Sequence, residues 1–143
     1  MQNYMKLELA ALSENESFAR SAVAAFALPL SPSFSDLSDI KTAVSEAVTN
    51  CIVHAYKGGE GRIDIECRIE KAPRGGILHI VITDYGCGIE DVEEAMTPFF
   101  TTLENDERSG MGFTVMQTFS TFFQVESELG KGTRIVMQKA VGM

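Results

Sequence analysis

The sequence predicts an α/β fold, a two-layer sandwich in which helices cover one face of a mixed, mostly antiparallel sheet. Segments with alternating apolar and polar residues are typical of half-buried strands, and other segments carry apolar residues at helical spacing. Glycine-containing turns near residues 71–76 and 129–132 are short enough to join antiparallel strands as hairpins. Such strands present one apolar face, so the helices must cover it.

The first part of the chain predicts a strand followed by a helix. Leu7 and Leu9 alternate with charged residues, which indicates a strand at residues 6–12. Ser13 and Glu16 then have the spacing of a capping box, which predicts the start of a helix. The residues expected on the apolar face of this helix are Phe18, Ala22, Ala25 and Phe26.

A second, longer helix is expected to begin near Ser35 or Asp36 and to end near Lys57, before two glycines. Its apolar residues recur at helical spacing over nearly the whole length. This predicted stripe consists of Leu37, Ile40, Val44, Ala47, Val48, Cys51, Ile52 and Ala55.

The rest of the chain predicts two hairpins with a short helix between them. Residues 63–70 and 77–83 read as paired strands, and residues 125–128 and 133–138 as a final hairpin. A third apolar helix is expected to open at Gly110. We see neither a repeat nor a linker, so residues 1–143 are expected to form a single domain.

Composition excludes several function classes. The net charge is −8 with a pI near 4.7, and an acidic surface repels phosphate backbones, which argues against direct nucleic-acid binding. Three cysteines without a CxxC pair predict neither a zinc site nor a disulfide framework, and free thiols suit the cytoplasm. Neither a signal peptide nor a membrane-spanning run is visible, so we expect a cytoplasmic protein that does not enter the membrane.

Glu46 and Asn50 lie four residues apart in the second predicted helix, so they share a face, which lies off the apolar stripe. One interpretation is an exposed polar helix face. The other is a metal-and-base pair. Asn50 offers a neutral oxygen to Mg²⁺, which takes few protein ligands beside water and phosphate oxygens, and Glu46 accepts or orients the proton of an attacking hydroxyl.

A second cluster is the glycine-rich loop DYGCGI, which follows a predicted strand. Asp84 can accept a hydrogen bond from the amino group of adenine, where guanine carries a keto oxygen, so it would favour ATP. Gly86 and Gly88 lack a Cβ and let the backbone approach a nucleotide. The competing interpretation is an ordinary Asp-Gly turn.

Two more glycine-containing segments complete the set. Ser109, Gly110, Met111 and Gly112 precede a predicted helix, where exposed backbone N–H groups suit phosphate oxygens. Thr133, after Gly132, is placed to hydrogen-bond near adenine, directly or through water. A flexible helix start and a tight hairpin explain the same residues without a ligand.

Taken together and in this order, the four segments resemble the GHKL ATPase superfamily. The matching motifs are SEAVTNCIVHAY (45–56), DYGCGI (84–89), SGMGF (109–113) and GKGT (130–133). A narrower likeness, in EAVTNCIVHAY, TPFFTT and ERSGMGFTVM, is to the anti-sigma F factors, which are sporulation serine-protein kinases. This likeness runs nearly end to end, and it implies ATP and Mg²⁺ as cofactors.

The resemblance also implies partners and residue roles. It implies a homodimer that captures a sporulation sigma factor and phosphorylates a serine on an anti-anti-sigma partner. The first predicted helix carries Arg20, where the family meets its protein partners, and Arg108 lies in a lid-like segment, where it either reaches a phosphate or is a solvated surface charge. By resemblance, Asn50 holds Mg²⁺, Glu46 is the general base and Asp84 reads adenine.

Three activities remain open at this point. The preferred one is direct phosphoryl transfer from ATP to a serine of another protein, with Glu46 orienting the hydroxyl. An ordinary histidine kinase is disfavoured, because the chain carries no phosphohistidine domain. The alternatives are a module that binds ATP and a sigma factor without transferring phosphate, and a general-stress anti-sigma kinase.

Overall fold

The computed structural model of the chain describes residues 1–96 and 112–143. Across these two ranges, every helix is too short or too polar to cross a bilayer. The elements, in chain order, are β1 (Tyr4–Ala10), α1 (Glu14–Phe26), the 3₁₀ turn η1 (Leu28–Leu30), α2 (Phe34–Thr49), the π-helical η2 (Asn50–Ala55), β2 (Arg62–Lys71), β3 (Gly76–Asp84), α3 (Val92–Ala95), α4 (Gly112–Phe119), β4 (Phe122–Glu128) and β5 (Gly132–Val141).

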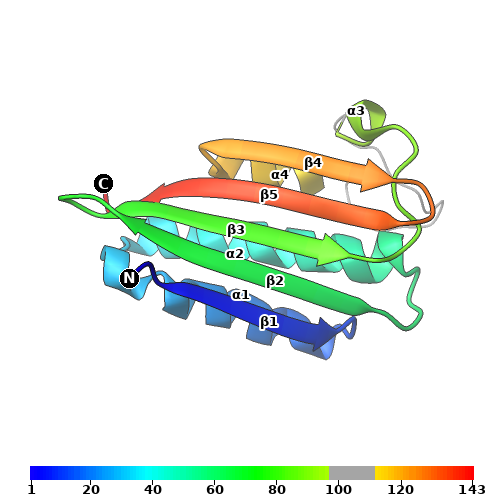
Figure 1. The fold of residues 1–143 in the computed structure, drawn as a ribbon, viewed down its shortest axis with the longest axis horizontal. Helices are drawn as coiled ribbons and strands as arrows, with labels where there is room; N and C mark the ends of the chain where they lie inside the picture. The colour runs from blue at the N-terminus through cyan, green and yellow to red at the C-terminus, as the bar shows by residue number, and fades with distance from the viewer. Residues whose placement is uncertain (97–111) are drawn as a thin grey trace.

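The five described strands form one sheet in the order β1-β2-β3-β5-β4, and each neighbouring pair is antiparallel. Figure 1 shows the strands running along the length of the molecule, with both chain termini at one end. The fold-class prediction is therefore confirmed. The last strand, β5, lies between β3 and β4, so β4 and β5 pair as the predicted hairpin and β3 pairs with β5 at long range.

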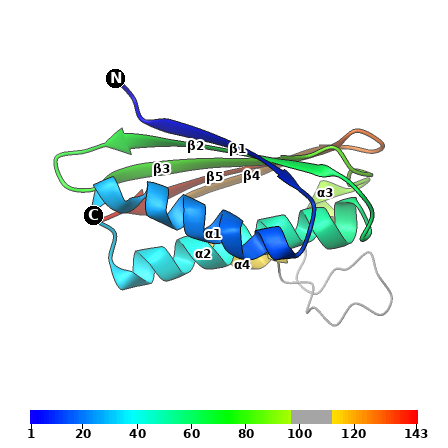
Figure 2. The same ribbon diagram turned by 90° about the horizontal axis from the view of Figure 1, so that it is seen from below.

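The helices α1, α2 and α4 pack together on one face of the sheet (Figure 2). The core lies between the two layers, and the predicted stripe of α2 supplies much of it. Ile40, Val44 and Val48 are at most 1 % exposed. From the sheet, alternate residues such as Ile63, Ile65, Leu78, Ile82 and Ile135 face the helices and are buried.

Two predictions for α1 are wrong. Phe18 is 53 % exposed, and the buried face consists of Ala19, Val23 and Ala24, because small side chains let α1 pack closely on α2. Ser13 makes no side-chain cap, since its backbone is already helical (φ −58°, ψ −30°) and a capping residue is normally extended. The capping box lies instead at the start of α2.

That capping box joins Ser33 and Asp36. The Ser33 hydroxyl accepts the Asp36 N–H at 3.0 Å, and the Asp36 carboxylate accepts the Ser33 N–H at 3.1 Å. The same carboxylate also accepts the N–H of Gly142 at 2.9 Å, which ties the end of β5 to the start of α2.

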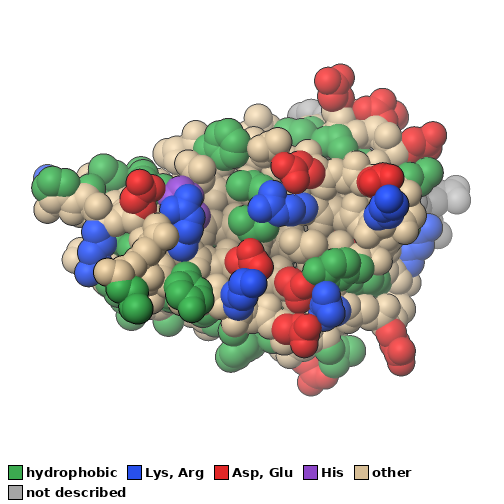
Figure 3. Space-filling model, in the orientation of Figure 1, with side chains coloured by type: hydrophobic (Ala, Val, Ile, Leu, Met, Phe, Trp, Pro, Cys, Tyr) green, Lys and Arg blue, Asp and Glu red, His purple; other side chains and the backbone are tan. Residues whose placement is uncertain are grey.

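The opposite face of the sheet carries rows of charged side chains (Figure 3). Opposite charges lie beside one another there, as in the Lys6–Glu66 pair at 3.1 Å and the Arg134–Glu126 pair at 3.3 Å. These pairs are largely exposed, so each contributes little to stability.

Candidate functional site

Glu46, Asn50 and Gly112 meet where α2 passes the start of α4. Glu46 lies in the last turn of α2, and Asn50 follows one turn later as the first residue of η2. A Cβ on Gly112 would lie 3.2 Å from Glu46 Oε2, 3.2 Å from Asn50 Oδ1 and 3.3 Å from Asn50 Nδ2. Two polar side chains therefore converge on a helix start, at a residue that has no side chain of its own.

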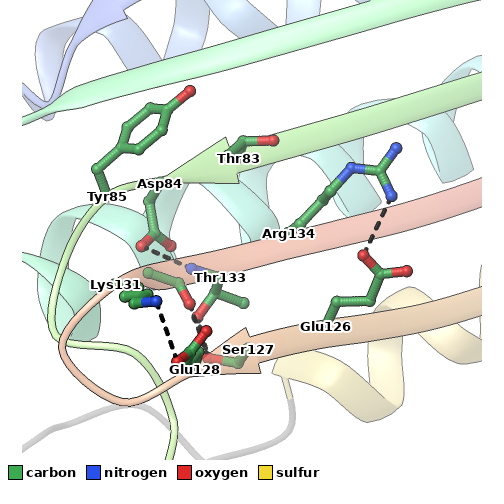
Figure 4. Close-up of a pocket in the computed structure, with 10 residues that line it drawn as sticks. Thr83, Asp84, Tyr85, Glu126, Ser127, Glu128, Lys131, Thr133 and Arg134 are labelled. Carbon is green, nitrogen blue, oxygen red and sulfur yellow. Dashed lines mark hydrogen bonds and ion pairs between the residues drawn. The ribbon is translucent and has the colours of Figure 1, made fainter.

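Asp84, the last residue of β3, forms the second half of the site and is only 5 % exposed. Its Oδ1 accepts the N–H of Gly86 at 3.0 Å and the N–H of Thr133 at 3.2 Å; Figure 4 shows the carboxylate turned toward Thr133. Burial raises the pKa of Asp84, and these amides, with the Cys51 thiol, offset that rise only in part. Because a carboxylate has about four acceptor positions, Oδ2 can take a further donor.

Cys51 connects the two halves of the site. It directly follows Asn50 in the chain, is 1 % exposed and shares a side-chain hydrogen bond with Asp84. Burial and the charge of Asp84 raise the pKa of this thiol well above its ordinary value, so it stays protonated and donates to the carboxylate. The end of β3, which carries Asp84, and the end of α2, which Asn50 follows, lie at the same end of the molecule, away from the chain termini (Figure 1).

The glycines of the DYGCGI loop are needed by the protein backbone itself. A Cβ on Gly86 would lie 2.5 Å from the carbonyl oxygen of Ala55, and a Cβ on Gly88 would lie 2.2 Å from that of Glu128. Gly88 also has φ +75°, which side chains rarely adopt. The loop is thus held between the end of η2 and the β4–β5 turn.

Thr133 is 7 % exposed and enters the site from β5. Its hydroxyl lies 2.8 Å from Ser127 Oγ, which also accepts the N–H of Ile89 at 2.8 Å and donates to the carbonyl of Gly132 at 3.0 Å. Ser127 thereby joins the glycine loop, β4 and β5 at one hydroxyl.

A shallow pocket of about 310 Å³ borders this hairpin, lined in part by Asp84 and Thr133. Its other walls come from charged residues such as Arg134 and Glu126, which form an ion pair (Figure 4). Because Arg134 and Glu126 are exposed, whereas their neighbour Thr133 is buried, the pocket opens mainly toward the charged face of the sheet. Glu46, Asn50 and Gly112 do not line this pocket.

The remaining predicted residues stand apart. Arg20 lies on α1, donates to Ser45 Oγ at 3.4 Å and pairs with Glu16 at 3.9 Å, so it contacts the helix that carries Glu46. The predicted phosphate-lining and lid residues Arg108, Ser109, Gly110 and Met111 lie outside the described residues.

The donor set suits magnesium held mainly by a nucleotide. In residues 1–96 and 112–143, His, Cys, Asp and Glu side chains form no group of three that could hold a metal ion. A single amide oxygen is nevertheless compatible with Mg²⁺, which keeps several waters and takes phosphate oxygens as ligands. Asn50 Oδ1 faces Gly112, which has no side chain to cover it, and this is compatible with such an arrangement.

Comparison with known proteins agrees with this fold. Residues 9–139 match the model of the histidine kinase-like ATPase domain, which defines the class of fold and implies an ATP site. A solved structure of the RsbU and RsbW domains of Rv1364c from Mycobacterium tuberculosis superposes with a TM-score of 0.65 at 17 % identity, covering 97 % of this chain and 32 % of that one. At this identity, the superposition supports the fold alone.

Curated relatives identify one family within this class of fold. The anti-sigma F factor of Caldanaerobacter subterraneus subsp. tengcongensis is 54 % identical over 98 % of this chain and 95 % of its own length. Those of Thermoanaerobacter pseudethanolicus and Geobacillus stearothermophilus are 53 % and 50 % identical, over 98 % of this chain in each case and over 95 % and 94 % of their own lengths. The chain belongs to the anti-sigma F factor family.

Sequence reasoning missed three residues that the structure places around Asp84. Cys51 belongs to the apolar stripe of the second predicted helix, where its burial hides its polar contact with Asp84. Tyr56 closes the SEAVTNCIVHAY motif, and its position there was the available signal. Ser127 carried no signal, because its role arises from strand pairing opposite Thr133.

Proposed function

We propose that this chain is an anti-sigma factor and serine-protein kinase that binds Mg-ATP, sequesters a sporulation sigma factor and phosphorylates a serine on an anti-anti-sigma partner. The observation that carries the proposal is the convergence of Glu46, Asn50 and Gly112 beside the Asp84 cluster, bridged by Cys51. Family membership supports the same function, since the curated relatives are named anti-sigma F factors.

At the adenine end of the site, Asp84 Oδ2 accepts a hydrogen bond from the adenine amino group, while the amides of Gly86 and Thr133 donate to Oδ1. The Thr133 hydroxyl, fixed by Ser127, lies beside the same position. Adenine offers a donor where guanine offers an acceptor, so this arrangement selects ATP over GTP.

At the phosphate end, Asn50 holds Mg²⁺, and the backbone from Ser109 to Gly112, with Arg108, receives phosphate oxygens at the start of α4. The metal, when bound, neutralises charge that develops on the phosphates. Glu46 orients the incoming serine hydroxyl and takes its proton, which is typically worth 10²- to 10⁴-fold in rate. Phosphoryl transfer of this kind depends chiefly on positioning and electrostatics.

Two contact surfaces are proposed. Protein partners bind at the surface of α1 and α2, and a second copy of the chain binds at the edge strand β1. Arg20 lies on α1 with its side chain 39 % exposed, beside the helix that carries Glu46. A partner that engages Arg20 therefore approaches the proposed reaction centre. A homodimer is proposed through the edge strand β1, whose described partner within the chain is β2 on one side.

The kinase assignment is tested with purified chain, a purified anti-anti-sigma protein and labelled Mg-ATP. We expect label on a partner serine. Glu46→Gln should lose transfer by at least 100-fold while it keeps nucleotide and sigma-factor binding, whereas Glu60→Gln, at an exposed loop position, should behave as wild type. Label on a histidine of this chain would refute the assignment, and full activity of Glu46→Gln would leave a general base without support.

Partner identity is tested by a pull-down from sporulating cells in ATP and in ADP. We expect a sigma factor to be retained in a nucleotide-dependent manner, and its mass-spectrometric identity separates a sporulation factor from a general-stress factor. Light scattering over a concentration series tests the dimer: a protein that stays monomeric at high concentration rules it out.

A further inference from the structure

The Tyr56 hydroxyl joins three elements next to the proposed nucleotide site. Tyr56 caps the end of η2, and its backbone N–H donates to the carbonyl of Cys51 at 3.0 Å, which closes the π-helical turn. Its hydroxyl donates to the carbonyl of Arg62 at 2.5 Å and accepts the N–H of Tyr85 at 2.8 Å. One oxygen atom thus connects the helix that carries Asn50 to the residue that follows Asp84.

The ring of Tyr56 packs directly against Gly61. A Cβ on Gly61 would lie 2.3–2.5 Å from three ring carbons, so a glycine is required there for the ring to fit. The chain returns around the ring through Lys57 and Gly58, both at positive φ, and Gly59 N–H donates to the Tyr56 carbonyl at 2.8 Å. The orientation of the hydroxyl is therefore fixed by packing as well as by its hydrogen bonds.

The residue after Asp84 is held from its other side as well. The Tyr85 hydroxyl donates to Asp64 Oδ2 at 2.5 Å, and the Arg62 guanidinium lies 4.5 Å from the centre of the Tyr85 ring. Further along the loop, Cys87 N–H donates to the carbonyl of Ala55 at 3.0 Å. The Tyr56 hydroxyl and the Ala55 carbonyl are thus the adjacent points at which η2 grips the loop.

We propose that the Tyr56 hydroxyl is a positioning group that fixes the end of β3 against η2, and so sets the separation between the adenine-reading Asp84 and the magnesium-holding Asn50. Tyr56 acts through Tyr85 N–H, which donates to its hydroxyl. The inference rests on the proposed function, because it assigns a position to the two groups named there. Burial raises the pKa of Tyr56, which keeps the hydroxyl protonated as the donor to Arg62.

The test is Tyr56→Phe, which removes the hydroxyl and keeps the ring in its place against Gly61. The matched control is Thr121→Val, which removes an exposed hydroxyl that likewise donates to a backbone carbonyl, that of Gln138 at 2.8 Å. Calorimetry on the full chain measures the affinities for Mg-ATP and Mg-GTP, well below the unfolding temperature of each variant. We expect Tyr56→Phe to weaken Mg-ATP binding about tenfold, which corresponds to about 1.4 kcal/mol, and to reduce the ATP-over-GTP preference by at least threefold.

A purely structural role would lower the unfolding temperature without changing that preference, so an unchanged ATP-to-GTP ratio in Tyr56→Phe overturns the inference. Wild-type protein that takes up neither nucleotide, or both equally, instead overturns the proposed function and the inference with it.

If Tyr56→Phe does not fold, hydrogen exchange of the Tyr85 amide in the wild-type chain decides. The proposal requires protection of this amide without ligand and at least tenfold slower exchange with Mg-ATP. An amide that exchanges as fast as an unstructured one, or at a rate that nucleotide leaves unchanged, overturns the inference.

Discussion

Gly132 packs directly against the backbone of Asp84, where β5 begins beside the end of β3. A Cβ at Gly132 would lie 2.2 Å from the Asp84 carbonyl oxygen, and the residue has φ +123°. The two strands are paired there through Asp84 and Thr133. The position of the buried carboxylate therefore depends on the missing side chain of a residue on another strand.

Gly132→Ala should consequently separate β5 from β3 at the site. We expect it to destabilise the protein by several kcal/mol, since it combines a backbone collision with a disfavoured φ, and to abolish ATP binding. Gly130→Ala in the same turn is the matched control: Gly130 has φ +82° but open space around it, so about 1–2 kcal/mol is expected. Chemical denaturation measures both, and equal losses would contradict the packing argument.

Gly112→Ala separates binding from stability. The added methyl would lie 3.2 Å from an oxygen of Glu46 and from an oxygen of Asn50, a few tenths of an ångström too close to each. Alanine is more favourable than glycine in a helix by about 0.5–1 kcal/mol. This gain offsets the cost of the close contact, so the free energy of unfolding should change little. Calorimetry should show Mg-ATP binding weakened tenfold or more, whereas Gln117→Ala on the exposed side of α4 should bind normally. Unchanged affinity in Gly112→Ala would remove Gly112 from the proposed site.

The pKa values of two aspartates, Asp84 and Asp36, should lie on opposite sides of the ordinary value of about 3.9. Burial raises the pKa of Asp84, and its hydrogen-bond donors do not cancel the rise. Burial also acts to raise the pKa of Asp36, but the amides of Gly142 and Ser33 outweigh it, and the pKa is lowered. Carboxyl carbon NMR through the acid range measures both midpoints; Asp84 titrating below Asp36 would contradict the structure.

The sign of each effect on stability follows by linkage. Asp36 contributes stability above the ordinary pKa, and this is lost as the pH falls through its lower native pKa. Asp84 behaves oppositely: its contribution is present below the ordinary pKa and is lost as the pH rises through its higher native pKa. The stability of wild type relative to Asp36→Asn should therefore rise with pH, and relative to Asp84→Asn it should fall.

Ser127→Ala tests the junction of loop and hairpin. The change removes the acceptor of the Ile89 N–H and the neighbour of the Thr133 hydroxyl. A buried donor left without a partner costs about 1–3 kcal/mol, and because this donor is only part-buried we expect a loss of about 1 kcal/mol by denaturation, together with weaker ATP binding. Ser38→Ala, at an exposed position of α2, should stay within about 0.5 kcal/mol of wild type. A Ser127→Ala variant as stable as Ser38→Ala would show that water replaces the hydroxyl.

Periodicity predicted the elements well where one face is buried. Ile63, Ile65, Cys67 and Ile69 alternate with polar residues and are all buried in β2, and the stripe of α2 forms the core as expected. The same logic failed for α1, because hydrophobicity predicts burial of Phe18, whereas close helix packing selects the small residues Ala19 and Val23. Ser13 failed as a cap because spacing alone does not fix its backbone conformation.

The site could be predicted only where ligand chemistry constrains residue type. Asp84, Asn50 and Glu46 carry donor and acceptor groups that suggest a nucleotide, and the order of the motifs placed them together. Cys51, Tyr56 and Ser127 hold these residues in place through tertiary contacts. Cys51 contacts Asp84, 33 positions along the chain, Tyr56 contacts Tyr85, 29 positions along, and Ser127 contacts Thr133, six positions along on the paired strand. Such contacts depend on strand order and register, which local patterns do not encode.

The position of β5 between β3 and β4 has a consequence during synthesis. A nascent chain that has emerged as far as β4 carries two strand edges that wait for the same missing neighbour, and residues 132–141 must leave the ribosome before either is covered. Until then the unpaired edges of β3 and β4 are available for wrong pairings. β5 therefore joins β4 to the rest of the sheet, and the sheet can be completed only after these ten residues have been synthesised.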